Sequence, residues 1–136
     1  MTKKEIDALT YQIIGAAIDV HKEIGPGLLE SVYHECLIHE LNERNMALES
    51  ELHVPLRYKG KDLKTNLKCD LVVQDSVLVE LKVIDIVMPV HQAQLLTYMR
   101  LLKKPKGILI NFNCTHIFKE GQQTFVNEHY RRLKAS

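Results

Sequence analysis

Three charged residues interrupt two apolar runs in the segment CDLVVQDSVLVELKV, residues 69–83: Asp70, Glu80 and Lys82. An unpaired charge is costly to bury, so charges within such runs usually have a partner or a function. Two carboxylates can hold a hard divalent cation, and a lysine beside them can orient a water and stabilise charge that develops on a phosphate. The three residues therefore indicate a site for phosphodiester hydrolysis. The alternative is an exposed strand face that carries a Glu–Lys pair.

The proposed site depends on which way Asp70 points. Side chains alternate along a strand, so Glu80 and Lys82 share one face. Directly opposed residues of an antiparallel pair also point to the same face. A three-residue connection, Gln74-Asp75-Ser76, places Asp70 on the face of Glu80, whereas a two-residue loop would set it opposite Leu81. We therefore predict the three-residue connection.

The elements that position these residues follow from the hydrophobic pattern. A T-x-x-E capping box at Thr2 and Glu5 predicts a helix start, and Gly25-Pro26-Gly27 predicts its end. Further expected elements are a helix over 28–45, strands within 47–58, 66–73 and 76–84, a helix from Pro89 to about residue 103, and a strand over 106–113. Residues 116–125 could extend the sheet, and residues 126–135 could form a short helix. The order α-α-β-β-β-α-β predicts an α/β (α+β) fold with a central mixed sheet flanked by helices.

Length and composition suit one domain spanning residues 1–136, since the chain is 46% hydrophobic and has a net charge of +1. No apolar stretch approaches the roughly 20 residues of a membrane helix, so we expect no membrane partner. The N-terminus lacks a signal-peptide core, which predicts a cytoplasmic protein. The three cysteines, Cys36, Cys69 and Cys114, are too few for a four-cysteine site, so no iron–sulfur cluster or zinc site is expected.

Positive charge is concentrated in the segment RYKGKDLKTNLK, which holds five cations: Arg57, Lys59, Lys61, Lys64 and Lys68. Such a segment could contact phosphates, and the alternative is a solvated hairpin.

The spacing of Asp70, nine residues, and Glu80-x-Lys82 resembles the signature of the PD-(D/E)XK nuclease superfamily, with Cys69 in place of the usual proline. The predicted element order is also similar to the α-β-β-β-α-β core of that superfamily, with one extra helix in front. This resemblance implies a restriction-endonuclease-like fold.

Two further motifs narrow the resemblance. Gly27-x-x-Glu30-x-x-Tyr33 resembles the motif of the GxxExxY family, a branch of the same superfamily. Gln94-x-x-x-Tyr98 is similar to the Q-x-x-x-Y motif of RecB-type nucleases.

The resemblance implies a nuclease that depends on Mg²⁺ or Mn²⁺ and acts on DNA or RNA. Asp70 and Glu80 would be metal ligands, together with Glu30 and the backbone carbonyl of Leu81. Lys82 would position the attacking water.

On the substrate side, Gln94 and Tyr98 are expected on one helical face, where Gln94 could bind Lys82 or a phosphate. Tyr98 could contact the substrate backbone or stack on a base, with packing of the helix on the sheet as an equal alternative. Tyr33 shares the helical face of Glu30, with core packing as an equal alternative. Lys59 and Lys61 are further substrate-binding candidates. Histidines 34, 39, 53, 116 and 129 show no ligand spacing and are interpreted as incidental.

Two other functions fit the same residues. One is a catalytically silent module that binds nucleic acid or protein on a nuclease fold. The other is a small-molecule phosphoesterase, which the low net charge allows. Because no separate substrate-reading domain is evident, a second copy of the chain or another protein could supply recognition.

Overall fold

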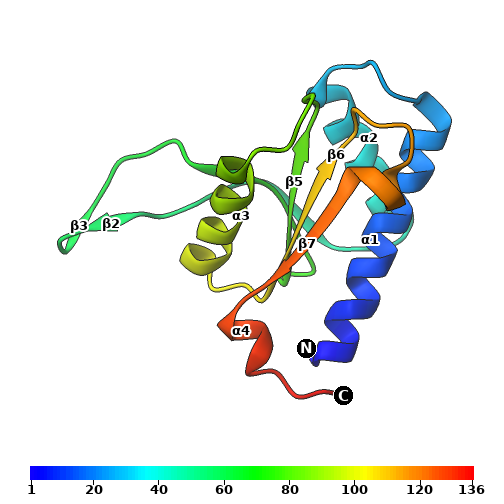
Figure 1. Ribbon diagram of the computed structural model, residues 1–136. Helices are drawn as coiled ribbons and strands as arrows, with labels where there is room; N and C mark the ends of the chain where they lie inside the picture. The colour runs from blue at the N-terminus through cyan, green and yellow to red at the C-terminus, as the bar shows by residue number, and fades with distance from the viewer.

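Five strands form the central sheet in the computed structural model, which describes residues 1–136 (Figure 1). In spatial order they are β1 (Leu48–His53), β4 (Lys68–Val73), β5 (Val77–Lys82), β6 (Lys106–Asn111) and β7 (Gln122–Val126). β5 and β6 are parallel, and all other neighbours are antiparallel. The predicted α/β fold with a mixed sheet between helices is confirmed.

Two helices, α1 (Lys3–Ile24) and α2 (Glu30–Glu43), cover one face of the sheet. The predicted capping box begins α1, because Thr2 Oγ1 accepts the Glu5 N–H and Glu5 Oε1 accepts the Thr2 N–H. α1 ends at Gly25, whose φ of +68° favours glycine. The apolar sides of both helices pack on the inward residues of the sheet, among them Leu71, Val79, Leu81 and Ile108.

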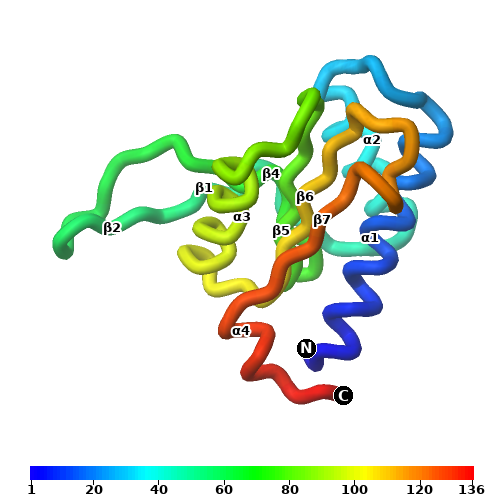
Figure 2. Tube along the Cα trace, viewed as in Figure 1, coloured from blue at the N-terminus to red at the C-terminus, as the bar shows by residue number.

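The opposite face is covered by α3 (Pro89–Leu102), as the tube view in Figure 2 also shows. Its residues Leu95 and Met99 pack on a second core that includes Val72, Leu78 and Leu109. This packing requires Gly107, because a Cβ there would lie 2.6 Å from Met99 Sδ. The sheet is therefore buried on both faces.

The segment expected as one strand over 47–58 is interrupted, which corrects the prediction. β1 ends at His53, and residues 54–67 leave the body of the molecule as a projection, here called the arm (Figure 1). Within the arm, β2 (Arg57–Tyr58) and β3 (Lys61–Asp62) form a separate two-stranded ladder. Pro55 explains the break, because it has no N–H to donate to the main sheet.

The C-terminal part extends the sheet only in its second half. Residues Ile117–Gly121 form a single π-helical turn, η1, before β7 pairs with β6. A short helix, α4 (Glu128–Arg131), follows, and the Lys3 N–H donates to the Lys134 carbonyl over 2.8 Å. None of the helices combines the length and apolar character needed to span a membrane.

Candidate active site

The hairpin of β4 and β5 has the register on which the predicted site depends. It pairs Leu71 with Val79, so the next step of the same register sets Asp70 opposite Glu80. The connection consists of residues 74–76, with two of them in the left-handed region at φ +52° and +53°. The predicted three-residue connection is confirmed, but the ladder ends at Leu71–Val79, so Asp70 and Glu80 meet through backbone-to-side-chain hydrogen bonds and not as a ladder pair.

The sheet is interrupted on both sides of Asp70. Towards β5, the Asp70 N–H donates to Glu80 Oε1 over 3.2 Å, and the Leu81 N–H donates to Asp70 Oδ2 over 2.8 Å. Towards β1, the register would pair Asp70 with Glu51, but Glu51 has φ +53° and the pair does not form. The Asp70 carbonyl instead lies 3.2 Å from His34 Nε2. Side chains therefore replace the sheet ladder around this carboxylate.

Glu80 is a buried carboxylate, with 5% of the residue exposed. Burial, and then the neighbouring Asp70, raise the pKa of Glu80 to about 8. Hydrogen bonds from the Asp70 N–H and the Cys69 thiol, and the charge of Lys82, act in the opposite direction without cancelling the shift. The ionised form of Glu80 is therefore under-compensated by the protein alone.

Glu30 and Lys82 complete the group. Glu30 is the first residue of α2, and partial burial of its carboxyl group, followed by the charge of Asp70, raises its pKa. Lys82 lowers the pKa of both Glu30 and Glu80, so its ammonium group lies within electrostatic reach of both. The structure thus brings together the four residues that the sequence motifs selected, from β4, β5 and the start of α2.

Comparison with known protein families gives a match that covers most of the chain. The family model described as PD-(D/E)XK nuclease superfamily matches residues 7–125, which include all four residues. The chain belongs to the PD-(D/E)XK nuclease superfamily. Comparisons with curated proteins and with solved structures give no match. Membership supports a nuclease-type function in general.

Divalent metals are the usual cofactors of this superfamily, so the fit of the site to such an ion matters. The structure contains no group of three or more His, Cys, Asp or Glu side chains arranged to hold a metal. Asp70 and Glu80 nevertheless offer hard oxygen donors, and Asp70 Oδ1 accepts no hydrogen bond from the protein. Mg²⁺ is commonly held by one or two carboxylates plus waters and substrate phosphates. The under-compensated Glu80 and the free oxygen of Asp70 fit such an ion.

Two supporting residues were missed from sequence. His34, interpreted as incidental, contacts the Asp70 carbonyl and lies 3.2 Å from Ser50 Oγ. Its signal was the Glu30-x-x-x-His34 spacing, which sets both residues on one face of α2. Asn111 is 7% exposed and holds the chain after Lys82, since it accepts the Ile84 N–H over 3.1 Å and donates to the Ile84 carbonyl over 2.9 Å. Its signal was an amide within an otherwise apolar strand.

The two substrate-binding candidates on α3 differ in their exposure to solvent. Tyr98 is 5% exposed, and burial, followed by the charge of Glu80, raises the pKa of its hydroxyl group. It therefore lies beside the carboxylates. Gln94, one turn earlier, is exposed.

Tyr33 packs in the core instead of lining the site. It is fully buried and stacks on Phe112 with ring centroids 4.4 Å apart. Its hydroxyl donates to the Gly25 carbonyl over 2.5 Å and accepts the Leu28 N–H over 3.3 Å. Tyr33 therefore fixes the turn that leads into Glu30, which is the packing alternative of the sequence analysis.

Lys59 and Lys61 are exposed on the arm, around the turn between β2 and β3. They lie apart from the carboxylates along the chain, and the structure shows no direct contact with them.

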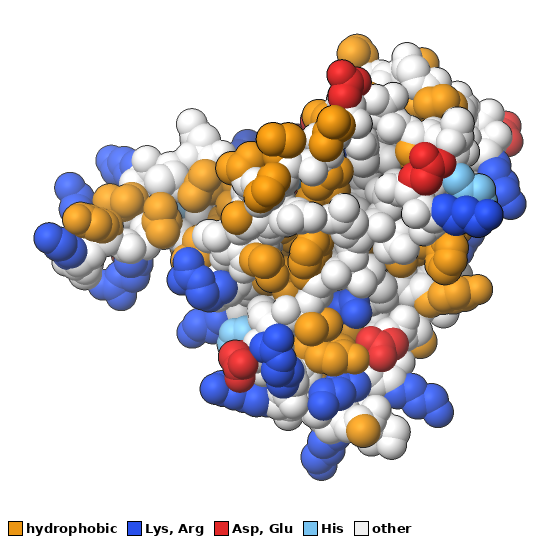
Figure 3. All heavy atoms as spheres, in the orientation of Figure 1, with side chains coloured by type: hydrophobic (Ala, Val, Ile, Leu, Met, Phe, Trp, Pro, Cys, Tyr) orange, Lys and Arg blue, Asp and Glu red, His pale blue; other side chains and the backbone are white.

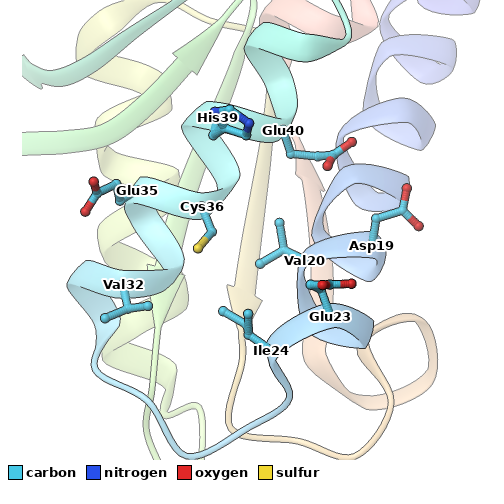
Figure 4. A pocket seen from close by; sticks show the side chains of 9 residues that line it. All are labelled: Asp19, Val20, Glu23, Ile24, Val32, Glu35, Cys36, His39 and Glu40. Atoms are coloured by element: carbon cyan, nitrogen blue, oxygen red, sulfur yellow. The ribbon is translucent and has the colours of Figure 1, made fainter.

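The largest cavity, about 580 Å³, lies elsewhere, between α1 and α2 (Figure 4). Its walls combine acidic side chains with an apolar floor and one histidine: Asp19, Val20, Glu23, Ile24, Val32, Glu35, Cys36, His39 and Glu40. We call it the helix groove. None of the predicted site residues lines it.

Proposed function

We propose that this protein is a nuclease that depends on Mg²⁺ or Mn²⁺ and hydrolyses phosphodiester bonds of DNA or RNA. The observation that carries the proposal is the opposition of Asp70 and Glu80 where the sheet ladder is interrupted, with Lys82 on the same strand. The superfamily match supports it.

In this proposal Asp70 and Glu80 hold the cation, and Glu30 and the Leu81 carbonyl contribute further oxygens. A bound divalent ion would supply Lewis acidity towards a phosphoryl oxygen and an activated water. The protein orients the ligands: the Leu81 N–H fixes the Asp70 carboxylate, and the Asp70 N–H fixes that of Glu80. The Lys82 ammonium group would orient the attacking water and stabilise charge that develops on the phosphate.

Substrate contacts are assigned to the elements around this group. Exposed Gln94 would contact a phosphate, and Tyr98 would contact the backbone or a base near Glu80. Lys59 and Lys61 would contact phosphates further along the chain of the substrate. The Gly27-x-x-Glu30-x-x-Tyr33 and Gln94-x-x-x-Tyr98 motifs support placement in the GxxExxY, RecB-like branch of the superfamily.

The position of the carboxylates outside the cavities of the surface favours a polymer over a small molecule as the substrate. Asp70, Glu80 and Lys82 line none of the four cavities of 270–580 Å³ that indent the surface. A phosphoesterase for small molecules would enclose most of its ligand.

The test is cleavage by the purified protein, with Mg²⁺ or Mn²⁺, of single-stranded, duplex and branched DNA and RNA. We expect cleavage of at least one substrate, its loss on chelation of the metal, and its loss in Lys82→Ala. Lys119→Ala, at an exposed lysine of η1, is the matched control and should cleave like the wild type. Equal behaviour of wild type and Lys82→Ala on every substrate would reject the proposal in favour of a silent binding module.

A further inference from the structure

The arm, whose lysines Lys59 and Lys61 are assigned to substrate phosphates above, and the apolar residues beside it form one surface next to the candidate active site. We propose that this surface binds single-stranded nucleic acid and leads it to the candidate active site. The inference rests on the proposed function, because it names the form of its substrate.

The arm carries cations that lack carboxylate partners. Its one acidic residue, Asp62, pairs with Arg57 over 3.1 Å, and Arg57 also donates to the Gly60 carbonyl over 2.9 Å. The remaining lysines, Lys59, Lys61 and Lys64, are exposed and form no ion pair. Such lysines are available to a polyanion, and binding to them releases counterions.

An exposed aromatic ring lies among these cations. Tyr58 is 59% exposed on β2, and the Lys59 ammonium lies 5.4 Å from its ring centroid. A tyrosine in this position buries little surface within its own chain. Its ring is free to stack on an unpaired base, and neighbouring lysines would hold the adjoining phosphates.

Apolar side chains continue from the arm towards the site. Ile86, Met88 and Val90, in the segment between β5 and α3 and at the start of α3, are 70%, 51% and 68% exposed. Figure 3 shows apolar side chains gathered over this part of the molecule and along the arm, with basic side chains at the tip. We call these three residues the rim. They begin four residues after Lys82.

The arm and the rim both adjoin the candidate site. At the base of the arm the Val54 N–H donates to the Leu67 carbonyl over 2.8 Å, and Val54 belongs to the α3-side core that contains Tyr98. Asp70 follows Leu67 by three residues, or about 10 Å of extended chain. A strand lying along the arm therefore reaches the carboxylates at its base.

The apolar and aromatic components decide between single-stranded and duplex substrates. A duplex offers this surface mainly phosphates and sugars, since its bases are paired and stacked. Lysines alone would suffice for it, and Tyr58 and the rim would remain exposed to water or face phosphates. Unpaired bases offer a π-face and apolar area to the Tyr58 ring and to the rim. Charge for phosphates combined with stacking area for bases is therefore complementary to a single strand.

The test is binding without cleavage, measured by fluorescence anisotropy in EDTA with labelled DNA and RNA strands of about 16 nucleotides, within the site size of single-strand-binding folds, and their duplexes. We expect tighter binding of single strands than of duplexes. Tyr58→Ala should weaken single-strand binding about 5- to 150-fold, as expected for loss of one stacked base, and Tyr58→Phe should bind like the wild type. The matched control is Tyr11→Ala, a tyrosine on α1 that is 75% exposed.

Salt dependence tests the lysines separately. The slope of log K against log salt should fall by about 0.7 for each arm lysine removed, so by about 1.4 in a Lys59→Ala/Lys61→Ala variant. Tyr58→Ala should leave the slope unchanged. The control is Lys22→Ala/Lys119→Ala, at exposed lysines outside the arm. Circular dichroism should show that all these surface variants fold.

Equal or tighter binding of duplexes, or unchanged binding by the Tyr58→Ala and lysine variants, overturns the inference. If such variants still cleave, the proposed nuclease function stands without it. If single strands bind as expected but no metal supports cleavage, the proposed function fails and the binding surface stands. Capture of a protein by the arm in place of nucleic acid would likewise overturn the inference.

Discussion

The molecule has two groups of acidic side chains that differ in burial and in the positive charge that lies beside them. At the candidate active site, Asp70 and Glu80 sit within the sheet, and burial and mutual repulsion raise the pKa of Glu80 to about 8. In the helix groove, the acids lie on helix surfaces, and Arg44 forms ion pairs with Asp19 and Glu40. The carboxylates of the candidate active site lack enough neighbouring positive charge, whereas two carboxylates of the helix groove pair with an arginine.

The difference shows why composition alone does not locate function. The helix groove is the largest cavity and is lined by four acidic residues, two of which, Asp19 and Glu40, pair with Arg44. In the smaller group around Glu80, burial and repulsion between carboxylates disfavour the charged form, and a bound proton or cation offsets that cost. The raised pKa of Glu80, and not the number of acidic residues, distinguishes the candidate active site.

The largest expected contrast between the two regions is in catalysis. Asp70→Asn should lower nuclease activity by about 100-fold or more, because it removes a charged ligand from the site. Asp19→Asn makes the same chemical change in the helix groove and should retain wild-type activity. Initial rates on the best substrate of the wild type measure both. Equal losses in the two variants would contradict the assignment of the site.

The second contrast is in the pH dependence of stability. The pKa of Glu80 is about 8 in the folded protein and has an ordinary value of 4.5. Between these values the folded state holds the extra proton, so stability falls as pH rises, by up to about 1.4 kcal/mol per pH unit. Glu80→Gln removes this loss and should stabilise the metal-free protein by a few kcal/mol at pH 9, with little change near pH 4.5.

Urea unfolding at a series of pH values measures this effect. Glu35→Gln, in the helix groove, is the control and should follow the wild-type curve. A Glu80→Gln curve parallel to that of the wild type across the whole range would show that Glu80 is ionised without cost in the folded protein.

The sequence was sufficient to predict the features that follow from the alternation of side chains along strands and from local signals. The three-residue connection between β4 and β5, the capping box at Thr2 and the helix that begins at Pro89 all depend on near neighbours. The sequence also specified which of the acidic residues would meet, because the motif fixed their order on adjacent strands.

Other features depend on contacts between distant segments. The arm projects because Pro55 has no N–H to donate, so the chain does not continue β1 as a strand of the main sheet. His34 acquires a role only because α2 lies over the break in the ladder at Asp70. The burial that raises the pKa of Glu80 is likewise produced by α3 and the sheet together, so no local pattern could give it.

A divalent cation should sharpen the same contrast by supplying the missing charge. Mg²⁺ or Mn²⁺ at ten times its dissociation constant should stabilise the wild type by about 1.4 kcal/mol, seen as a rise of a few degrees in Tm. The rise should be larger at pH 8 than at pH 6, because a proton competes with the cation for Glu80 at the lower pH.

Asp70→Asn should lose this thermal shift, and Asp19→Asn should keep it. Because the readout is unfolding, it reports binding of the ion independently of cleavage. A shift that survives in Asp70→Asn but disappears in a helix-groove variant would place the cation between α1 and α2.

The smallest expected effect comes from the helix groove itself. Arg44→Gln removes the ion pairs with Asp19 and Glu40, whose side chains are 52% and 31% exposed. Exposed pairs of this kind contribute about 1 kcal/mol or less, and salt screens them. We therefore expect a small loss of stability in urea unfolding at low salt and a smaller one at high salt. Removal of charge should thus destabilise the groove at pH 9, whereas Glu80→Gln stabilises the site, and a shared sign would contradict the difference between the two acidic groups.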